Sequence, residues 1–206
     1  GRLSDQALKN TAKHLPIVVT GRNIKGAGLF ALNFDNFAGG VLATEHLISL
    51  GHRKIAFISG DAAHPDANER LRGYTTALKN AGIPFDANLV VPGDYQVESG
   101  LAATDLLLAS RRKFTAIFCA NDQMAYGAAL SLHRKGLRTP EDVSLIGFDD
   151  IYHSLYVAPP LSTIHQPAYE MGRLTASSIL QMLAGNKPTA AMPAPELIIR
   201  ESTAKL

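Results

Sequence analysis

The stretch that decides the fold class is residues 114–150, FTAIFCANDQMAYGAALSLHRKGLRTPEDVSLIGFDD. A short apolar run ends in Asn121-Asp122, a helical pattern follows over residues 123–135, and a second apolar run ends in Asp149-Asp150. Gly136 suits the C-terminal cap of the helix. A strand, a helix and a strand of these lengths predict a parallel crossover unit.

The same alternation continues along the rest of the chain and predicts an α/β fold built on doubly wound parallel sheets. The expected strands lie at residues 17–20, 29–34, 55–59, 88–91, 116–120, 143–148, 161–165 and 196–199. The main expected helices lie at residues 40–50, 69–80, 98–109, 123–135 and 169–183, with residues 62–68 between strand and helix as a polar loop.

Polar residues close several apolar runs that lead toward a helix. They are Asp61, Asp94, Asn121-Asp122 and Asp149-Asp150. Such residues are common in turns, and that explanation stays open for any single strand. Because parallel strands bring their carboxyl ends to one rim, where ligands bind in open sheets, the recurrence favours a binding site.

Tyr95 and Arg70 are expected beside this rim. An aromatic ring next to carboxylates and amides provides apolar area for a sugar or a flat polar ring, while the polar groups orient hydroxyls. Arg70 would add a charge-assisted hydrogen-bond donor. The alternative is that Arg70 pairs with Glu69 or Glu45 on the surface.

Composition and charge exclude several other functions. The 206 residues are 46% hydrophobic and 18% charged with a net charge of +2, too mild for nucleic-acid binding by this segment. No run is apolar enough to cross a membrane. The single cysteine, Cys119, lies in an apolar strand run and is expected to be a buried thiol.

No catalytic or metal-binding constellation stands out. The seven histidines are scattered without zinc-site spacing, and no phosphate-cradling or serine-nucleophile motif is present. The glycines of residues 26–31 match a dinucleotide fingerprint only formally, because a strand and not a helix is expected after them. We therefore expect binding without catalysis, metal or cofactor.

Several separated motifs resemble, in the same order, the effector-binding core of the lactose/galactose-repressor (LacI/GalR) family of bacterial transcription regulators. These are LATEHLISLGHRKIAFISG (42–60), ERLRGYTTALKNAGIP (69–84), VPGDYQVESG (91–100), FTAIFCANDQMAYGA (114–128), GLRTPEDVSLIGFDD (136–150), PPLSTIHQPAYEMG (159–172) and ELIIREST (196–203). The resemblance implies a periplasmic-binding-protein-like fold, in which three crossovers join two subdomains and an effector binds in the cleft between them.

The resemblance also implies a domain division. Residues 1–35 and 166–195 would form an N-terminal subdomain that is incomplete in this chain, and residues 36–165 and 196–206 the C-terminal one. It assigns effector binding to Arg70, Tyr95, Asn121, Asp149 and Gln166, and effector choice to His64 and Asp66. Gly21-Arg22 stands where many sugar-responsive members have an aspartate before the arginine.

The function implied is the effector-sensing and dimerisation domain of a cytoplasmic bacterial regulator that binds a small molecule, for which Tyr95 and the rim rich in Asp and Asn favour a sugar or glycoside over a purine. Operator DNA would be bound only through a helix-turn-helix absent from these residues. Tyr126 and Tyr156 are expected at a homodimer interface, unless they pack inside the monomer. The main rival is a periplasmic sugar-binding protein of a transport system, and an enzyme is a more distant one.

Overall fold

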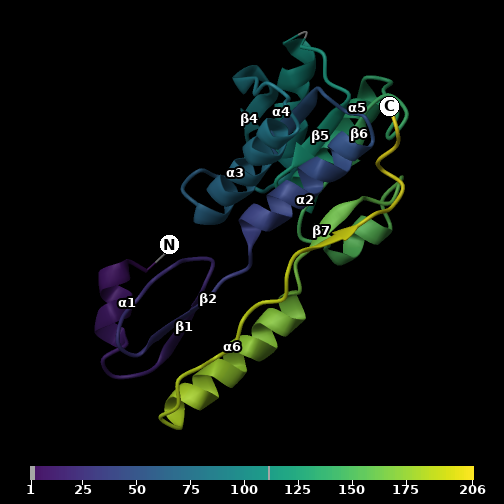
Figure 1. The fold of residues 1–206 in the computed structure, drawn as a ribbon. Helices are drawn as coiled ribbons and strands as arrows, with labels where there is room; N and C mark the ends of the chain where they lie inside the picture. Colours follow the sequence, from purple (N-terminus) through teal and green to yellow (C-terminus); the bar gives the residue numbers. More distant parts are fainter. Residues whose placement is uncertain (1–2, 111) are drawn as a thin grey trace. The chain divides into compact units, whose positions relative to one another are not determined.

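The computed structural model describes residues 3–110 and 112–206, and the chain forms two compact units (Figure 1). Unit 1 comprises Gly1–Asp35 and Pro167–Ala194, and unit 2 comprises Asn36–Gln166 and Pro195–Leu206. The chain therefore passes between the units three times, after Asp35, after Gln166 and after Ala194. These are called the first, second and third passages below. Gln166 and Pro195 fall in unit 2 here, one residue away from the expected division.

Unit 2 is built on a parallel sheet of four strands in the order β4-β3-β5-β6. The central strands β3 (Ile55–Ser59) and β5 (Ala116–Cys119) are buried almost throughout, as expected for the interior of a sheet covered on both faces. The edge strands are β4 (Val90–Pro92) and β6 (Ser144–Ile146). Cys119 is a buried free thiol, as the sequence predicts.

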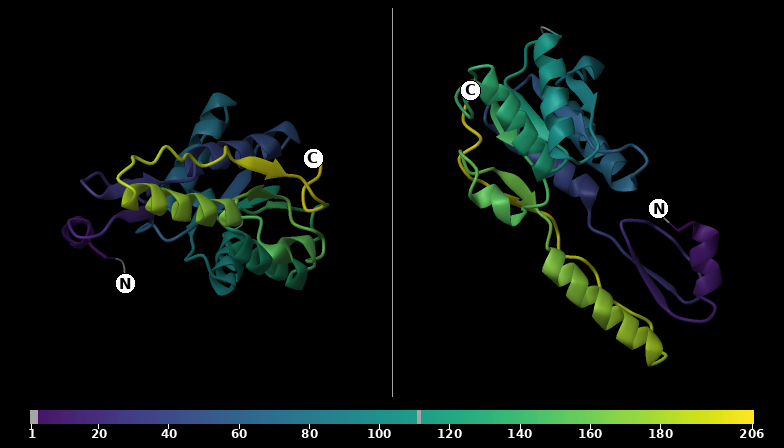
Figure 2. Two further views of the ribbon diagram at one scale, coloured as in Figure 1. Left: turned by 90° about the horizontal axis from the view of Figure 1, so that it is seen from below. Right: turned by 180° about the vertical axis from the view of Figure 1, so that it is seen from behind.

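Two helix pairs cover this sheet (Figures 1 and 2). Helix α2 (Asn36–Ser49) packs against α3 (Pro65–Asn80), and α4 (Val97–Ala109) packs against α5 (Asp122–Arg134). The chain moves from β3 outward to β4 and then back past β3 to β5, and right-handed crossovers put the two helix pairs on opposite faces. This is the doubly wound arrangement that the alternating pattern predicts.

An aromatic cluster fixes α3 on the sheet. The ring of Phe57 lies 5.0 Å, centroid to centroid, from the rings of both Tyr74 and Phe118. The Tyr74 hydroxyl donates to the carbonyl of Ile55 at 2.8 Å. Because residues four apart share a helix face, Arg70 is directed toward the sheet by the same packing.

The remainder of unit 2 includes the C-terminal segment. The antiparallel pair β7 (Thr163–His165) and β8 (Glu196–Ile198) lies beside β6, and two single 3₁₀ turns occur at Ala87–Leu89 and Tyr152–Leu155. Beyond β8, the carbonyl of Ser202 accepts from the Leu145 amide at 2.7 Å. The last residues are thus bound to the edge of the main sheet.

Unit 1 contains α1 (Asp5–Thr11), the parallel strands β1 (Ile17–Thr20) and β2 (Leu29–Leu32), and α6 (Ala168–Leu183). Its small core consists of Leu8, Val19 and Ile24, with Ile17 and Leu29 packed against it. Because β2 and not a helix follows the glycines of residues 26–28, rejection of the dinucleotide fingerprint is confirmed.

Two helices begin four residues earlier than the sequence analysis predicts, and both changes affect the site. Helix α3 begins at Pro65 and not at residue 69, because proline suits the first helical position and Asp66 the first turn. Helix α2 begins at Asn36 and not at residue 40. The expected polar loop is therefore mostly helical, and Asn36 is a buried residue at the first passage.

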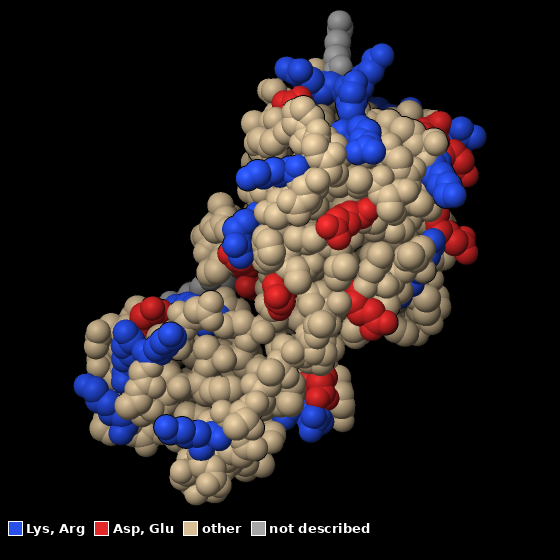
Figure 3. All heavy atoms as spheres, viewed as in Figure 1, with Lys and Arg blue, Asp and Glu red and all other residues tan. Residues whose placement is uncertain are grey.

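Charged side chains of both signs are interspersed with wide uncharged areas on the face shown in Figure 3, in keeping with the small net charge. In the part of the chain that the structure describes, every helix is too short or too polar to cross a membrane.

Candidate functional site

Arg70 is the centre of a group of polar side chains in unit 2. It lies on α3 and is only 5% exposed. Its Nε donates to Asn36 Oδ1 at 2.8 Å, its Nη1 donates to the Ala120 carbonyl, and its Nη2 donates to Gln166 Oε1 at 3.3 Å. The Asp149 carboxylate lies 3.4 Å from Nη1. We call Asn36, Arg70, Tyr95, Asp149 and Gln166 the Arg70 cluster.

The surface alternative for Arg70 is therefore wrong. Its neighbour Arg72, two residues further along α3, is the one that pairs with Glu69 at the surface. Arg70 is instead held between aromatic rings, with its guanidinium carbon 3.7 Å from the centroid of the Phe148 ring and 5.9 Å from that of Tyr95. Both distances are within the range of cation–π attraction.

The cluster forms where the topology predicts a site. Tyr95 follows β4, Ala120 follows β5, and Asp149 follows β6, so the carboxyl ends of three strands of one sheet supply three of the groups around Arg70. The chain reverses its winding direction between β3 and β5, and ligands in open parallel sheets bind outside the carboxyl ends of strands at that point.

Asp149 has an unusual backbone and an unusual acidity. Its φ is 109°, a region that residues other than glycine rarely adopt and that surrounding contacts must stabilise. Burial raises the pKa of Asp149 to about 6, an effect that Arg70 opposes and the nearby Asp122 carboxylate reinforces. The side chain is still 29% exposed, so a ligand has access to this carboxylate.

Tyr95 also has a positive φ, 72°, and its ring lies against the end of β3. Asn121 Nδ2 donates to the Tyr95 carbonyl at 3.0 Å and holds this turn. A Cβ atom at Gly60 would lie 2.1 Å from Cζ of Tyr95, so only glycine at that position leaves room for the ring. Burial raises the pKa of the Tyr95 phenol.

Gly60→Ala is accordingly expected to displace the Tyr95 ring and to weaken binding of a ligand stacked on it by about tenfold. Calorimetry on the two proteins would measure this. Gly172→Ala in α6 is the matched control, because an added Cβ there meets no atom within 4 Å. Equal affinity in the Gly60 variant would mean that Tyr95 does not contact the ligand.

The other predicted site residues lie close to this cluster. Asn121 caps α5, where its Oδ1 accepts from the Met124 amide at 2.9 Å, and one of its amide hydrogens is left for a ligand after the bond to Tyr95. The ring of His64 lies 5.7 Å, centroid to centroid, from that of Tyr95. Asp66, on the first turn of α3, raises the pKa of both Tyr95 and Asp149 through its charge.

Two rim carboxylates accept hydrogen bonds from backbone amides within their own turns. Asp61 Oδ1 accepts from the Ala63 amide at 2.8 Å, and Asp94 Oδ1 accepts from the Gln96 amide at 2.9 Å. The turn explanation therefore holds for these two positions.

Asn36 is not among the predicted site residues, and Asp122 is predicted only as one of the residues that close apolar runs at the rim. Asp122 is fully buried, and its carboxylate accepts from the hydroxyls of Thr163 and Ser154, each at 2.6 Å. Burial raises its pKa. Asn36 and Asp122 are each the first residue of a helix that follows a strand. The sequence contains this pattern, but the same pattern is also typical of helix capping.

The chemistry of the site is that of binding. Asp149 and Asp150 do not form an acid/base pair, because Asp150 is engaged by Arg200 and His165 while Asp149 faces Arg70. Both residues have positive φ and lie beyond β6. Among residues 3–110 and 112–206, no group of three or more His, Cys, Asp or Glu side chains is placed to hold a metal ion.

The two tyrosines expected at a dimer interface differ in exposure. The Tyr126 hydroxyl lies 2.6 Å from the Ser154 hydroxyl, inside unit 2, while Tyr156 is 65% exposed and packs on Tyr152 with ring centroids 4.9 Å apart. Packing inside the monomer therefore accounts for Tyr126 in part and not for Tyr156.

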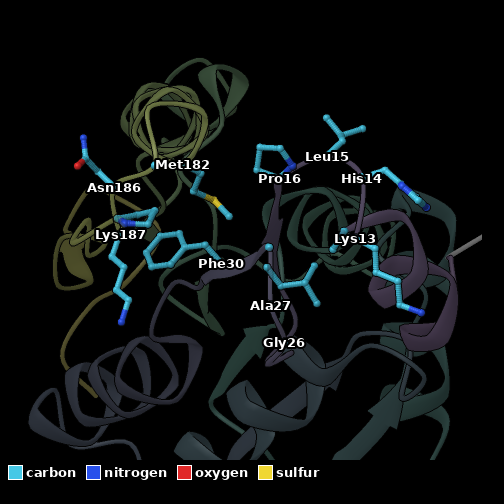
Figure 4. Close-up of a pocket in the computed structure, with 15 residues that line it drawn as sticks. Lys13, His14, Leu15, Pro16, Gly26, Ala27, Phe30, Met182, Asn186 and Lys187 are labelled. Atoms are coloured by element: carbon cyan, nitrogen blue, oxygen red, sulfur yellow. The ribbon is translucent and has the colours of Figure 1, made fainter.

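A separate groove of about 660 Å³ lies in unit 1 (Figure 4). Phe30 and Met182 line one side of it, and Lys13, Leu15 and Pro16 line another. None of the predicted effector-binding residues contributes to this groove, so it is distinct from the Arg70 cluster.

Comparison with known proteins identifies the family. Residues 44–203 match the family model described as a periplasmic binding protein-like domain. The chain is 40% identical over 172 residues to the HTH-type transcriptional repressor PurR of Haemophilus influenzae. The aligned region covers 81% of this chain and 51% of that protein. The chain thus spans about half the length of the curated relatives it matches.

Two crystal structures of regulators cover nearly the whole chain. A sugar-binding transcriptional regulator of the LacI family from Escherichia coli, complexed with phosphate, matches with a TM-score of 0.91 at 33% identity over 100% of this chain and 76% of that one. A LacI family regulator from Enterococcus faecium with bound ribose matches with a TM-score of 0.86 at 32% identity over 98% and 75%. The chain belongs to the LacI family of transcriptional regulators and has its periplasmic-binding-protein-like α/β fold.

Proposed function

We propose that this chain is the effector-sensing domain of a bacterial transcription regulator, and that a sugar or glycoside bound at the Arg70 cluster is its effector. The carrying observation is the convergence of a buried guanidinium, an accessible carboxylate and an aromatic ring on strand carboxyl ends of unit 2. Two of these residues, Tyr95 and Asp149, have backbone conformations typical of functional sites.

The chemistry of the cluster suits a polyhydroxylated ligand. The Asp149 carboxylate accepts hydrogen bonds from hydroxyls, the Arg70 guanidinium donates to ring or hydroxyl oxygens, and the Tyr95 ring covers an apolar sugar face. The ribose-bound relative supports this ligand class. We propose that Asn121, His64, Asp66 and Gln166 complete the contacts, and that no covalent step, metal or cofactor takes part.

Calorimetric titration with a panel of pentoses, hexoses and disaccharides tests this proposal. Asp149→Ala is expected to weaken binding of the sugar that binds by at least tenfold, because a charged hydrogen bond contributes ~1.5–3 kcal/mol. Arg138→Gln is the matched control, since Arg138 pairs with Asp142 at the surface of the same unit. Unchanged affinity in Asp149→Ala would contradict the assignment.

The proposed regulation acts in the cytoplasm and on a longer protein. Operator DNA would be bound through a helix-turn-helix that is not among these residues, as in relatives described as HTH-type repressors. An effector that binds one arrangement of the two units more tightly would favour that arrangement, because a ligand shifts an equilibrium only through differential affinity. Saturating sugar that leaves operator affinity of the complete regulator unchanged would favour a transport or storage role.

We also propose that the chain dimerises through the 3₁₀ turn at Tyr152–Leu155 and the adjoining Tyr156. Tyr152, Leu155 and Tyr156 are each at least half exposed, and together they form an apolar surface. Replacing Leu155 and Tyr156 with serine is expected to weaken dimerisation at least tenfold, since a few large residues dominate interfaces. Sedimentation at micromolar concentration measures the dimer affinity, and Tyr169→Ser, at an exposed residue of α6, is the control. A monomeric unmodified chain would rule the interface out.

A further inference from the structure

The turn formed by Asp149 and Asp150 connects to all three passages between the units. Both residues have positive φ, 109° and 56°, so the turn depends on its surroundings to keep its conformation. The turn contacts Gln166 at the second passage and Arg200, five residues beyond the third passage, and it reaches Asn36 at the first passage through Arg70. Each connection lies entirely within unit 2.

The connection to the first passage runs through Arg70. Asn36 is the first residue of unit 2 after this passage, and its Oδ1 accepts from Arg70 Nε at 2.8 Å. The same guanidinium lies 3.4 Å from Asp149 Oδ1. The start of α2 and the turn are thus held by one buried cation.

The connection to the second passage is direct. Gln166 is the last residue of unit 2 before this passage, and its backbone N–H donates to the Asp149 carbonyl at 3.2 Å. The preceding residue, His165, has its Nδ1 2.8 Å from Asp150 Oδ2. The turn therefore contacts this passage through both of its residues.

The connection to the third passage is an ion pair. Arg200 follows β8, and its Nη2 donates to Asp150 Oδ1 at 2.6 Å while its Nη1 donates to the Leu161 carbonyl at 2.7 Å. The side chains of Asp150 and Arg200 are each only 15% exposed. A pair this sheltered is screened by water much less than a surface pair.

We infer that the Asp149-Asp150 turn is the common anchor of the three passages, and that Asp150, Arg200 and His165 are positioning residues for it. Asp149 faces the proposed effector while Asp150 holds the second and third passages. An effector that moves Asp149 therefore acts on all three passages through one backbone turn. The regulatory consequence rests on the proposed function, but the mechanical coupling does not.

Hydrogen–deuterium exchange of the 206-residue chain, without any effector, tests the coupling. In Asp150→Asn the side chain loses its charge, while asparagine tolerates the positive φ of this position. Exchange is expected to become about tenfold faster in segments 36–42, 161–168 and 195–200 together, because a buried charged hydrogen bond is lost. The informative segment is 36–42, because its connection to Asp150 runs through Asp149 and Arg70.

Arg200→Gln is a second variant with the same expected pattern, and Arg138→Gln is the control that should leave all three segments unchanged. Acceleration confined to 161–168 and 195–200, or no acceleration, would overturn the inference and reduce the pair to a local contact. Sugar binding is measured separately on the unmodified chain. If none of the pentoses, hexoses and disaccharides binds, the proposed function is contradicted, but the exchange result and the coupling it measures are unaffected.

Discussion

Arg70→Met is expected to lower the free energy of unfolding of unit 2 by about 3–5 kcal/mol and to abolish measurable sugar binding. The methionine fills similar volume but removes the guanidinium hydrogen bonds to Asn36 Oδ1 and the Ala120 carbonyl and the ion pair with the Asp149 carboxylate. Buried acceptors and a sheltered charge that lose their partner incur the full cost of desolvation. Urea unfolding followed by circular dichroism measures the loss.

Arg72→Met is the control for this experiment because Arg72 is on the same helix and pairs at the surface. Its expected cost is at most ~1 kcal/mol, the usual size for an exposed pair. In the Arg70→Met background, Asp149→Asn is expected to recover stability, since it removes a charge that has lost its counterion. Equal losses for the two arginine variants, or no recovery, would show that Arg70 is not the structural centre of the cluster.

Sugar affinity is expected to fall about tenfold for each pH unit below 6, provided that the ligand hydroxyls need the ionised carboxylate of Asp149. Burial raises the pKa of this group to about 6 from an ordinary value of 3.8. At pH 7.5 the carboxylate is ionised and accepts hydrogen bonds, and at pH 5 it is mostly protonated in the free protein. Calorimetry at both pH values measures the change, and Asp149→Asn should flatten it.

The same pKa shift affects stability in the other direction. Between pH 3.8 and 6 the folded chain keeps a proton that the unfolded chain has released, so the contribution of Asp149 to the free energy of unfolding falls as pH rises through this window. The stability of Asp149→Asn relative to the unmodified chain is therefore expected to increase as the pH rises from 3.8 to 6. A sugar affinity that stays constant from pH 7.5 to 5 would contradict the role of the carboxylate.

The position of the site follows from sequence rules that are local. Apolar runs identify strands, strands of one parallel sheet share a rim, and the residues that close the runs are visible in the sequence. This is why Tyr95, Asn121 and Asp149 could be grouped before the structure was known. The same rules also included Asp61 and Asp94, because hydrogen bonds inside a turn and contacts to a ligand select the same residue types.

The partners of these residues depend on long-range packing and could not be read from the sequence. Arg200 reaches Asp150 across fifty positions because the C-terminal segment returns to the sheet edge. Arg70 faces inward because α3 begins at Pro65 and is fixed by Tyr74. The need for glycine at position 60 appears only when the ring of Tyr95 is in place. Helix boundaries and tertiary neighbours, not residue types, were the missing information.

The positive φ angles of Tyr95 and Asp149 have a consequence for directed evolution of this protein. Glycine would relieve strain of ~1–3 kcal/mol at either position and would thereby improve heat resistance. It would also delete the ring or the carboxylate that recognises the ligand. Variant libraries selected for thermal stability alone should therefore be enriched in glycine at positions 95 and 149. The most stable variants should be those that no longer bind the effector.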